Sequence, residues 1–239
     1  MNTTTTTTPK KQKKKVKIRL ARKQIQKKRE YTQVREEGGL EYNIWYHRRV
    51  GQYRTKDESD AAIPAKYRCN IVRDAGWTKG CEKKDAFFCL YFARGYCAEG
   101  HKCGYLHRIP TKRDELKLPL SHDCFGRERF ATDRNDMGGV GSFHRESKTL
   151  YVGNLKNIPG VHLDDTLRRH FREWGKLVYI RSFPEQCKAF IRFDLRSCAE
   201  FAKEAMWRQA LDDDEIIDIK WAADDDDEMA PAVFLHEKR

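Results

Sequence analysis

The chain has 239 residues, of which 39% are hydrophobic and 35% are charged, so it can bury a core beneath a heavily charged surface. No stretch approaches the roughly 20 apolar residues of a membrane span, and no apolar run follows the N-terminal basic cluster, so we expect neither a membrane protein nor a secretory signal. The net charge of +12 is compatible with a nucleic-acid partner. Residues 1–30 alone contribute +11, from twelve Lys and Arg against one acid, so the overall charge is weak evidence about the rest of the chain.

Residues 1–37 join a threonine run to a basic stretch of low hydrophobicity. Like charges repel and little apolar surface is available for burial, so we predict a disordered arm, or a helix that forms only on a partner. Such an arm can act as a nuclear-localisation signal, grip RNA, or simply be a solvated tail.

Residues 38–120 interleave aromatic residues with cysteines and bases and show little periodicity, as in modules where a metal replaces a large core. The spacing Cys89-x7-Cys97-x5-Cys103-x3-His107 supplies three thiolates and one imidazole, which is the closed ligand set of a structural zinc ion. We predict a CCCH zinc finger with one structural Zn2+ and no open position for catalysis.

Cys81 lies eight residues before Cys89 and is a second candidate ligand, but we interpret it as a small buried residue. The other cysteines have no partners at metal-ligand spacing, and the composition favours reduced thiols over disulfides. We therefore expect them to be packing residues as well. The cysteines expected to pack are Cys69, Cys81, Cys124, Cys187 and Cys198.

CCCH fingers bind single-stranded RNA by stacking bases on exposed aromatic rings, with basic side chains near the phosphates. The same rings can instead pack around a small metal core, and the sequence does not decide between the two roles. The candidates are Phe92, Tyr96 and Tyr105 for stacking, and Arg94, Lys102 and Arg108 for phosphate contacts.

Residues 121–147 connect the finger to the next domain. Glycines at 138, 139 and 141 argue against a regular element there. A connection of this length is usually functional or disordered, and the three phenylalanines within it favour an ordered segment packed on its neighbours.

Residues 148–222 alternate strands and helices in the order βαββαβ, the ferredoxin-like pattern of an RNA-recognition motif (RRM). Gly175 should end the first helix, and Ser197-x-x-Glu200 is a capping box that should open the second. Strands are expected at 148–155, 176–183, 187–194 and 215–222, and helices at 164–174 and 197–206.

Residues 150–155, LYVGNL, fit the RNP2 pattern of an RRM at every position, whereas residues 186–193, QCKAFIRF, fit only the second half of RNP1. Strand alternation places Tyr151, Lys188, Phe190 and Arg192 on the open face of the sheet. Tyr151 and Phe190 are then platforms for base stacking, with Lys188 replacing one aromatic ring. Asp218 and Lys220 flank this face. Some RRMs bind proteins instead, and a lost RNP1 aromatic is compatible with that alternative.

The order of zinc finger, connector and RRM resembles the Cwc-two family of pre-mRNA-splicing factors over roughly residues 40–222. The resemblance rests on YNIWY (42–46), RCNIVRDAGWT (68–78), FFCLYFARGYC (87–97), KCGYLHRIP (102–110), DCFGRERF (123–130), DMGGVGSF (136–143), TLYVGNL (149–155) and FAKEAM (201–206).

The resemblance implies a ring-like torus around the finger, which acts with the connector and the RRM as one RNA-binding unit. It also implies a nuclear protein of the spliceosome and its NineTeen complex that contacts U6 snRNA and intron RNA near the 5′ splice site. Carried over to this chain, it assigns zinc to Cys89, Cys97, Cys103 and His107, and adds the connector residues Phe125, Phe130 and Phe143 to the RNA surface.

We therefore expect an α+β protein in which a small zinc-stabilised torus and CCCH module (38–120) is joined by an ordered connector (121–147) to a ferredoxin-like βαββαβ RRM (148–222), followed by an acidic disordered tail (223–239). No nucleophile–base pair or phosphate-binding loop points to an enzyme or to a small-molecule substrate. The alternatives are a protein-binding RRM adaptor and a CCCH-type mRNA-regulating protein.

Overall fold

A computed structural model describes residues 19–26, 42–43, 48–49, 64–158, 160, 162–212 and 214–222. The predicted acidic tail and most of the basic arm lie outside these residues. Among the helices that are described, none combines the length and the apolar character needed to cross a membrane.

The C-terminal half is built on a four-stranded antiparallel sheet. Its strands are β3 (Thr149–Gly153), β4 (Leu177–Phe183), β5 (Lys188–Phe193) and β6 (Asp218–Trp221), arranged in the order β4-β5-β3-β6. With its two helices, this sheet has the predicted βαββαβ order, which confirms the RRM fold. The RNP2 strand β3 and the RNP1 strand β5 are the two central strands.

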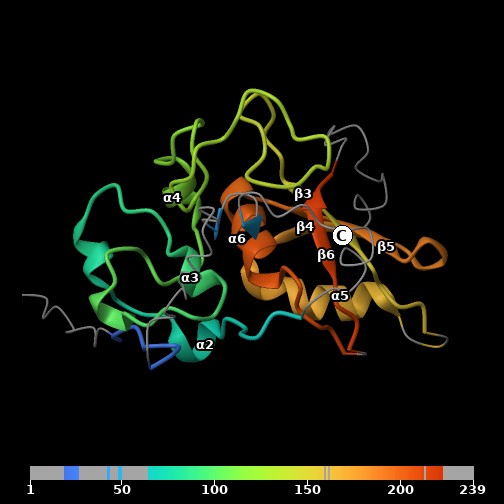
Figure 1. The fold of residues 1–239 in the computed structure, drawn as a ribbon, viewed down its shortest axis with the longest axis horizontal. Coiled ribbons are helices and arrows are strands. Elements are labelled where there is room, and N and C mark those ends of the chain that lie inside the picture. The colour runs from blue at the N-terminus through green and yellow to red at the C-terminus, as the bar shows by residue number, and fades with distance from the viewer. Residues whose placement is uncertain are drawn as a thin grey trace, which may run out of the picture.

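Two helices cover one face of the sheet (Figure 1). They are α5 (Leu163–Phe171), continued by the 3-10 turn η3 (Arg172–Trp174), and α6 (Arg196–Met206). Gly175 ends the first helix as predicted, at φ 153°. A Cβ atom there would lie 2.7 Å from Cys198 Sγ, so only glycine fits where the chain turns into β4.

The predicted capping box at the start of α6 is wrong. A side chain from α4 (Lys112–Glu115) caps the helix instead: Glu115 accepts the main-chain N–H groups of Arg196 at 3.1 Å and Ser197 at 2.9 Å. The Ser197 hydroxyl has no hydrogen-bond partner. Glu200 accepts the N–H of Cys124 in the connector at 2.7 Å. The carboxylate that caps α6 thus comes from outside the RRM.

The N-terminal half consists of short elements joined by loops. They are the paired strands β1 (Tyr42–Asn43) and β2 (Arg48–Arg49), the helices α2 (Ile71–Asp74), α3 (Leu90–Ala93) and α4, and the 3-10 turns η1 (Lys79–Glu82) and η2 (Gly100–Lys102). A further 3-10 turn, η4 (Pro184–Gln186), joins β4 to β5 in the RRM. Isolated bridges join Gly76 to His107 and Phe88 to Leu106. Elements this short need an additional organising centre.

Residues 19–26 differ from the disordered arm that we predicted for residues 1–37. This segment runs along the finger beside α2 (Figure 1). Leu20 forms a parallel bridge with Trp77, and the Ala21 N–H donates to the Trp77 carbonyl at 3.0 Å. Main-chain hydrogen bonds of this kind leave no periodic hydrophobic pattern, so they could not be predicted from the sequence.

The connector is ordered and packs on the RRM. The Trp221 N–H donates to the Met137 carbonyl at 2.9 Å, along the free side of β6. The Gly139 carbonyl accepts from Lys203 Nζ at 2.9 Å and from Trp221 Nε1 at 3.3 Å. The connector therefore ties β6 and α6 together.

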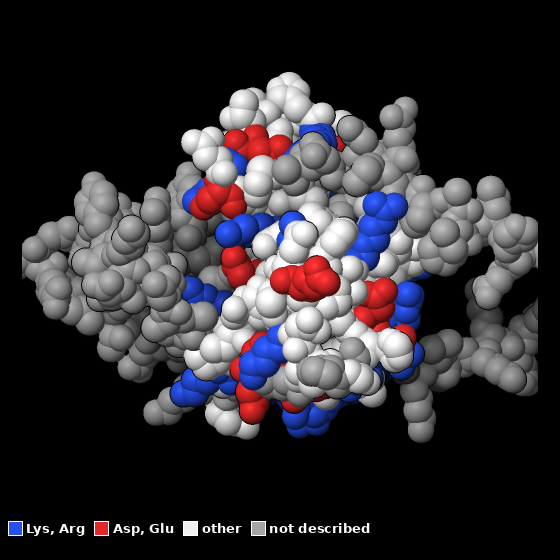
Figure 2. Space-filling model, turned by 90° about the vertical axis from the view of Figure 1, so that its right-hand side faces the viewer, with Lys and Arg blue, Asp and Glu red and all other residues white. Residues whose placement is uncertain are grey.

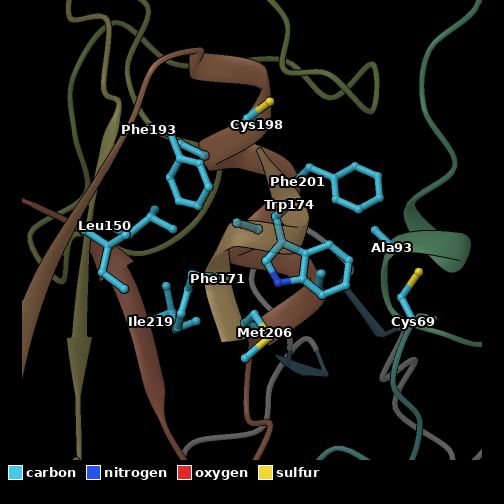
Figure 3. Packing of buried hydrophobic residues seen from close by; sticks show 14 of the residues in the cluster. Cys69, Ala93, Leu150, Phe171, Trp174, Phe193, Cys198, Phe201, Met206 and Ile219 are labelled. Carbon is cyan, nitrogen blue, oxygen red and sulfur yellow. The ribbon is translucent and has the colours of Figure 1, made fainter. Parts of the chain in front are cut away.

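Both halves share one hydrophobic core, and Phe201 of α6 lies at its centre. Its ring lies 6.4 Å from Phe88 and from Phe92 of the finger, 5.8 Å from Phe125 of the connector and 5.9 Å from Trp174 of the RRM. Figure 3 shows Cys69 and Ala93 of the finger beside Phe201 and Trp174. The finger and the RRM consequently form one packed unit.

Candidate nucleic-acid interface and metal centre

The four predicted metal ligands come together at a buried point of the finger. One ligand atom from each of Cys89, Cys97, Cys103 and His107 lies within 4.8 Å of the other three, and all four residues are buried. A tetrahedral zinc site, with Zn–S bonds of about 2.3 Å, needs ligand atoms roughly 4 Å apart. The spacing read from the sequence therefore corresponds to a cluster in space that can hold a metal ion.

Short helices and one aromatic ring position these ligands. Cys89 is the N-cap of α3, where its sulfur accepts the Phe92 N–H at 3.3 Å. Cys103 ends η2, and its N–H donates to the Gly100 carbonyl at 3.1 Å. The His107 ring is stacked on Phe92 with ring centroids 4.5 Å apart and an interplanar angle of 12°.

The chemistry of the cluster fits a metal of the zinc type. Both ring nitrogens of His107 are buried, and neither has a hydrogen-bond partner. Leaving such a group unsatisfied costs roughly 1–3 kcal/mol, so a ligated cation explains its position. Three thiols and one imidazole form the closed donor set of structural zinc.

The clustered thiols also perturb one another. Contacts with Cys103 and Cys89 lower the pKa of Cys97, whereas contacts with Cys103 and Cys97 raise the pKa of Cys89. One thiolate is thus stabilised by the protons of its neighbours. A divalent cation would replace those protons, so binding should release them and depend on pH.

Three of the five remaining cysteines confirm the packing prediction. Cys69, Cys124 and Cys198 are buried, and burial raises the pKa of Cys198 to about 12. The prediction is wrong for Cys81 and Cys187, which are exposed. Cys81 lies in the surface turn η1, and Cys187 occupies a left-handed position, φ 50°, in the tight turn between β4 and β5.

The structure separates the aromatic residues predicted for the finger surface. Phe92 is fully buried between His107 and Phe201, so the stacking role predicted for it is wrong. Tyr96 is half-buried, with its ring 5.5 Å from that of Tyr91. Tyr105 is 51% exposed and remains a candidate.

The basic residues of the finger also differ in accessibility. Arg94 has a nearly buried side chain that pairs with Glu204 of α6 at 2.7 Å, so the phosphate contact predicted for it is wrong. Arg108 forms two hydrogen bonds with Asp114, at 2.6 and 2.8 Å. Lys102 is exposed.

The connector phenylalanines divide in the same way. Phe125 is only 7% exposed and stacks on Phe201, so it is a core residue and the RNA contact predicted for it is wrong. Phe130 and Phe143 are 44% and 39% exposed. Their backbones are adjacent, because the Phe143 N–H donates to the Phe130 carbonyl at 2.9 Å. The connector thus exposes two aromatic rings on neighbouring backbone segments.

The open face of the sheet carries the residues that strand alternation predicted. Tyr151 and Phe190 are direct partners on β3 and β5, with ring centroids 5.8 Å apart and an interplanar angle of 68°. Lys188 and Arg192 lie two residues to either side of Phe190, and so share its face. All four side chains are partly exposed.

Strand β4 extends this face with three residues that the sequence analysis missed. Tyr179, Arg181 and Phe183 lie opposite Arg192, Phe190 and Lys188, respectively. The Phe183 ring lies 6.0 Å from that of Phe190 at 87°, with Lys188 Nζ 5.8 Å from the Phe183 ring centre. The same alternation, applied to KLVYIRSF, would have identified them.

Charge alone does not mark an RNA surface on the side of the molecule drawn in Figure 2. On the side shown in Figure 2, basic and acidic side chains are interspersed rather than gathered by sign. This agrees with the sequence, in which residues 1–30 hold most of the net charge. Exposed aromatic rings beside cations are the better guide to a single-stranded RNA site.

Buried ion pairs hold the finger and connector on the RRM. Glu204 of α6 pairs with Arg94 of the finger at 2.7 Å and with Arg127 of the connector at 2.8 Å. Arg127 also pairs with Asp123 at 2.7 Å. The candidate RNA-binding residues on the three parts therefore belong to one packed unit.

Comparison with known proteins finds two domain families in the chain. The Torus domain family matches residues 16–127, and the RNA recognition motif family matches residues 150–217. Each half of the molecule thus corresponds to a known domain.

Curated relatives match across both domains. The chain is 48% identical to "Pre-mRNA-splicing factor cwc2" of Dictyostelium discoideum over 81% of this chain and 35% of the relative. It is 45% identical to cwf2 of Schizosaccharomyces pombe over 86% of this chain and 52% of the relative. It is 44% identical to CWC2 of Pyricularia oryzae over 81% of this chain and 48% of the relative. The chain thus spans between about a third and a half of these relatives' lengths.

It joins a Torus domain to an RRM and is a homologue of the Cwc2 pre-mRNA-splicing factors over about four fifths of its length.

Proposed function

We propose that this protein is a non-catalytic pre-mRNA-splicing factor that binds single-stranded RNA. The observation that carries the proposal is the row formed by Tyr151 and Phe190 on the open sheet face, flanked by Lys188 and Arg192. The names of the relatives, all pre-mRNA-splicing factors, support splicing as the process.

The protein would act by positioning RNA. Unpaired bases stack on Tyr151 and Phe190, at roughly 1–3 kcal/mol per base, while Lys188 and Arg192 approach the phosphates. Tyr105 on the finger, and Phe130 and Phe143 on the connector, offer further exposed rings. Zn2+ in the finger would hold these surfaces in place without taking part in a reaction.

We propose that the target is U6 snRNA together with intron RNA near the 5′ splice site, where the protein would support the catalytic RNA conformation. Its protein partners would be components of the NineTeen complex, and it would work in the nucleus. The homology to splicing factors supports this choice over a regulator of mature mRNA.

Ultraviolet crosslinking in nuclear extract, with sequencing of the attached RNA, tests the proposal. The full chain is compared with a Tyr151→Ala/Phe190→Ala variant and with Leu116→Ala, which removes an exposed apolar side chain just after α4. We expect reads on U6 snRNA and intron 5′ ends that the double variant loses and the control keeps.

Other outcomes favour the alternatives. Reads spread over the 3′ regions of mature mRNA would indicate an mRNA-regulating protein. An absence of crosslinks, while splicing proteins still co-purify, would indicate an RRM that acts as a protein-binding adaptor.

A further inference from the structure

Gln24 reaches from the N-terminal segment into the zinc finger. Its side-chain oxygen accepts the main-chain N–H of the metal ligand Cys97 at 2.8 Å, and its side-chain nitrogen donates to the Phe92 carbonyl at 3.1 Å. Its own N–H donates to the Cys97 carbonyl at 2.9 Å. The side-chain nitrogen also lies 3.8 Å from Cys69 Sγ. Gln24 thus holds the backbone of a metal ligand from both sides.

The finger surface is shaped to receive this segment. A Cβ atom at Gly76 would lie 2.6 Å from the main-chain nitrogen of Ala21, and one at Gly100 would lie 2.9 Å from that of Lys23. Ala21 is buried at this contact. Such close backbone approach, at two glycines, is the packing of an integral part of the fold and not of a passing tail.

The docked segment brings cations to the loop that carries the metal ligands. Arg22 and Lys23 are exposed, and Lys23 lies against Gly100, the first residue of η2, which ends at the exposed Lys102. Among the residues that the structure describes, these three cations form no ion pair. Free cations grouped in this way suit the phosphate backbone of RNA.

We propose that Gln24 latches residues 19–26 onto the finger, so that metal binding and docking of this segment are coupled. The docked Arg22 and Lys23 then extend the finger surface for RNA phosphates. The coupling is reciprocal by thermodynamic necessity: whatever the latch adds to metal affinity, the metal adds to the docking of the segment. The RNA part rests on the proposed function, whereas the coupling does not.

Metal release tests the latch directly. Full-length Gln24→Ala is compared with Gln26→Ala, which changes an exposed glutamine two residues away in the same segment. With zinc loaded and a chromophoric chelator in excess, Gln24→Ala should lose zinc about tenfold faster, because two side-chain hydrogen bonds around Cys97 are gone. Gln26→Ala should match the unaltered protein. Equal release from all three proteins would overturn the latch.

The reciprocal experiment uses the unaltered protein, so it does not depend on a variant that folds. Trypsin cleaves after Arg22 and Lys23 only when the segment is released. Removing zinc with a chelator that spares trypsin should speed cleavage there at least several-fold, as followed by mass spectrometry. Cleavage at the same rate with zinc bound would show that the segment is not held.

The RNA part has its own test. Arg22→Ala/Lys23→Ala should weaken binding to a single-stranded RNA and make the dependence of affinity on salt shallower by about one unit per lost phosphate contact. Zinc release should stay unchanged. Unaltered RNA affinity would remove the phosphate role and leave the latch standing. A protein that binds no RNA in either form would instead contradict the proposed function.

Discussion

His107 shows how one residue serves both the metal and the core. Its ring lies on Phe92, while both of its nitrogens lack hydrogen-bond partners. Phe92 in turn contacts Phe201 of the RRM. Loss of the imidazole therefore removes a ligand and exposes a ring that belongs to the shared core.

Replacing His107 with alanine should abolish stoichiometric zinc binding and unfold the finger, because structural zinc contributes roughly 10–16 kcal/mol to folding of such modules. Zinc content by mass spectrometry and RNA affinity by fluorescence anisotropy check the result, and the RNA loss should exceed what the RRM face alone explains. His101→Ala, a change at the nearby histidine outside the cluster, is the control. Full zinc content in His107→Ala would mean that the ligand assignment is wrong.

At this scale, residue type and spacing predicted the ligands but not the burial of their neighbours. The four ligands lie within 19 positions of one another, so local spacing reveals them. The sequence offers Phe92 and Arg94 as candidates for an RNA surface, but their actual partners, Phe201 and Glu204, lie about a hundred positions further along the chain. Local sequence patterns do not predict contacts between residues so far apart.

Helix α6 is the element on which the whole arrangement depends. It packs on the sheet, accepts a cap from Glu115, and presents Phe201 and Glu204 to the finger. Its position was predictable from the periodicity of its apolar residues, as were the four strands of the RRM. Its capping and its docking partners were not, because both come from another domain.

Glu204→Gln should destabilise the protein by about 3 kcal/mol or more, because it leaves the buried guanidinium groups of Arg94 and Arg127 without their shared carboxylate. Urea unfolding of the full chain measures the change. The matched control is Asp212→Asn, which breaks the exposed pair with Arg169 and should cost no more than about 1 kcal/mol. Similar losses in the two variants would argue against a buried docking pair.

Glu200 of α6 should make the stability of the protein depend on pH. Burial raises the pKa of this carboxyl from 4.5 to about 7. The folded state therefore holds a proton that the unfolded chain has already released between pH 4.5 and pH 7. The free energy of unfolding should thus fall as pH rises through this interval, by up to about 3 kcal/mol.

Glu200→Gln should flatten that slope, because the amide oxygen can still accept the Cys124 N–H but has no proton to lose. Urea unfolding at several pH values between 4.5 and 7 measures how the free energy of unfolding changes with pH. The control is Glu128→Gln, at an exposed position of the connector. An unchanged slope in Glu200→Gln would assign the dependence to another group.

The whole molecule behaves as one unit because the finger, the connector and the RRM meet at Phe201. The sequence predicted the torus module with its finger and the RRM correctly in kind. It did not predict that they share a core, nor that residues 19–26 belong to the finger. Contacts between domains depend on shape in three dimensions, which single-sequence patterns do not record.

Removing the metal should therefore loosen the RRM as well as the finger. In the full chain, chelation should increase hydrogen exchange in peptides from β3 and β5, which lie beneath the α6 core but outside the finger. Mass spectrometry resolves these peptides, and adding zinc back should restore their protection. If exchange rose only in the finger, the two halves would be stable independently of each other.

The central position of Phe201 has a consequence for how the chain matures during its synthesis. The ribosome produces the metal ligands first and Phe201 about a hundred residues later, although the ring of Phe201 completes the packing behind Phe92. Domains generally fold in the order in which they leave the ribosome. Here the core of the N-terminal domain is complete only after α6, near the end of the RRM, has been synthesised. A nascent finger therefore exposes apolar rings during that interval, and its final structure forms only when translation has passed α6.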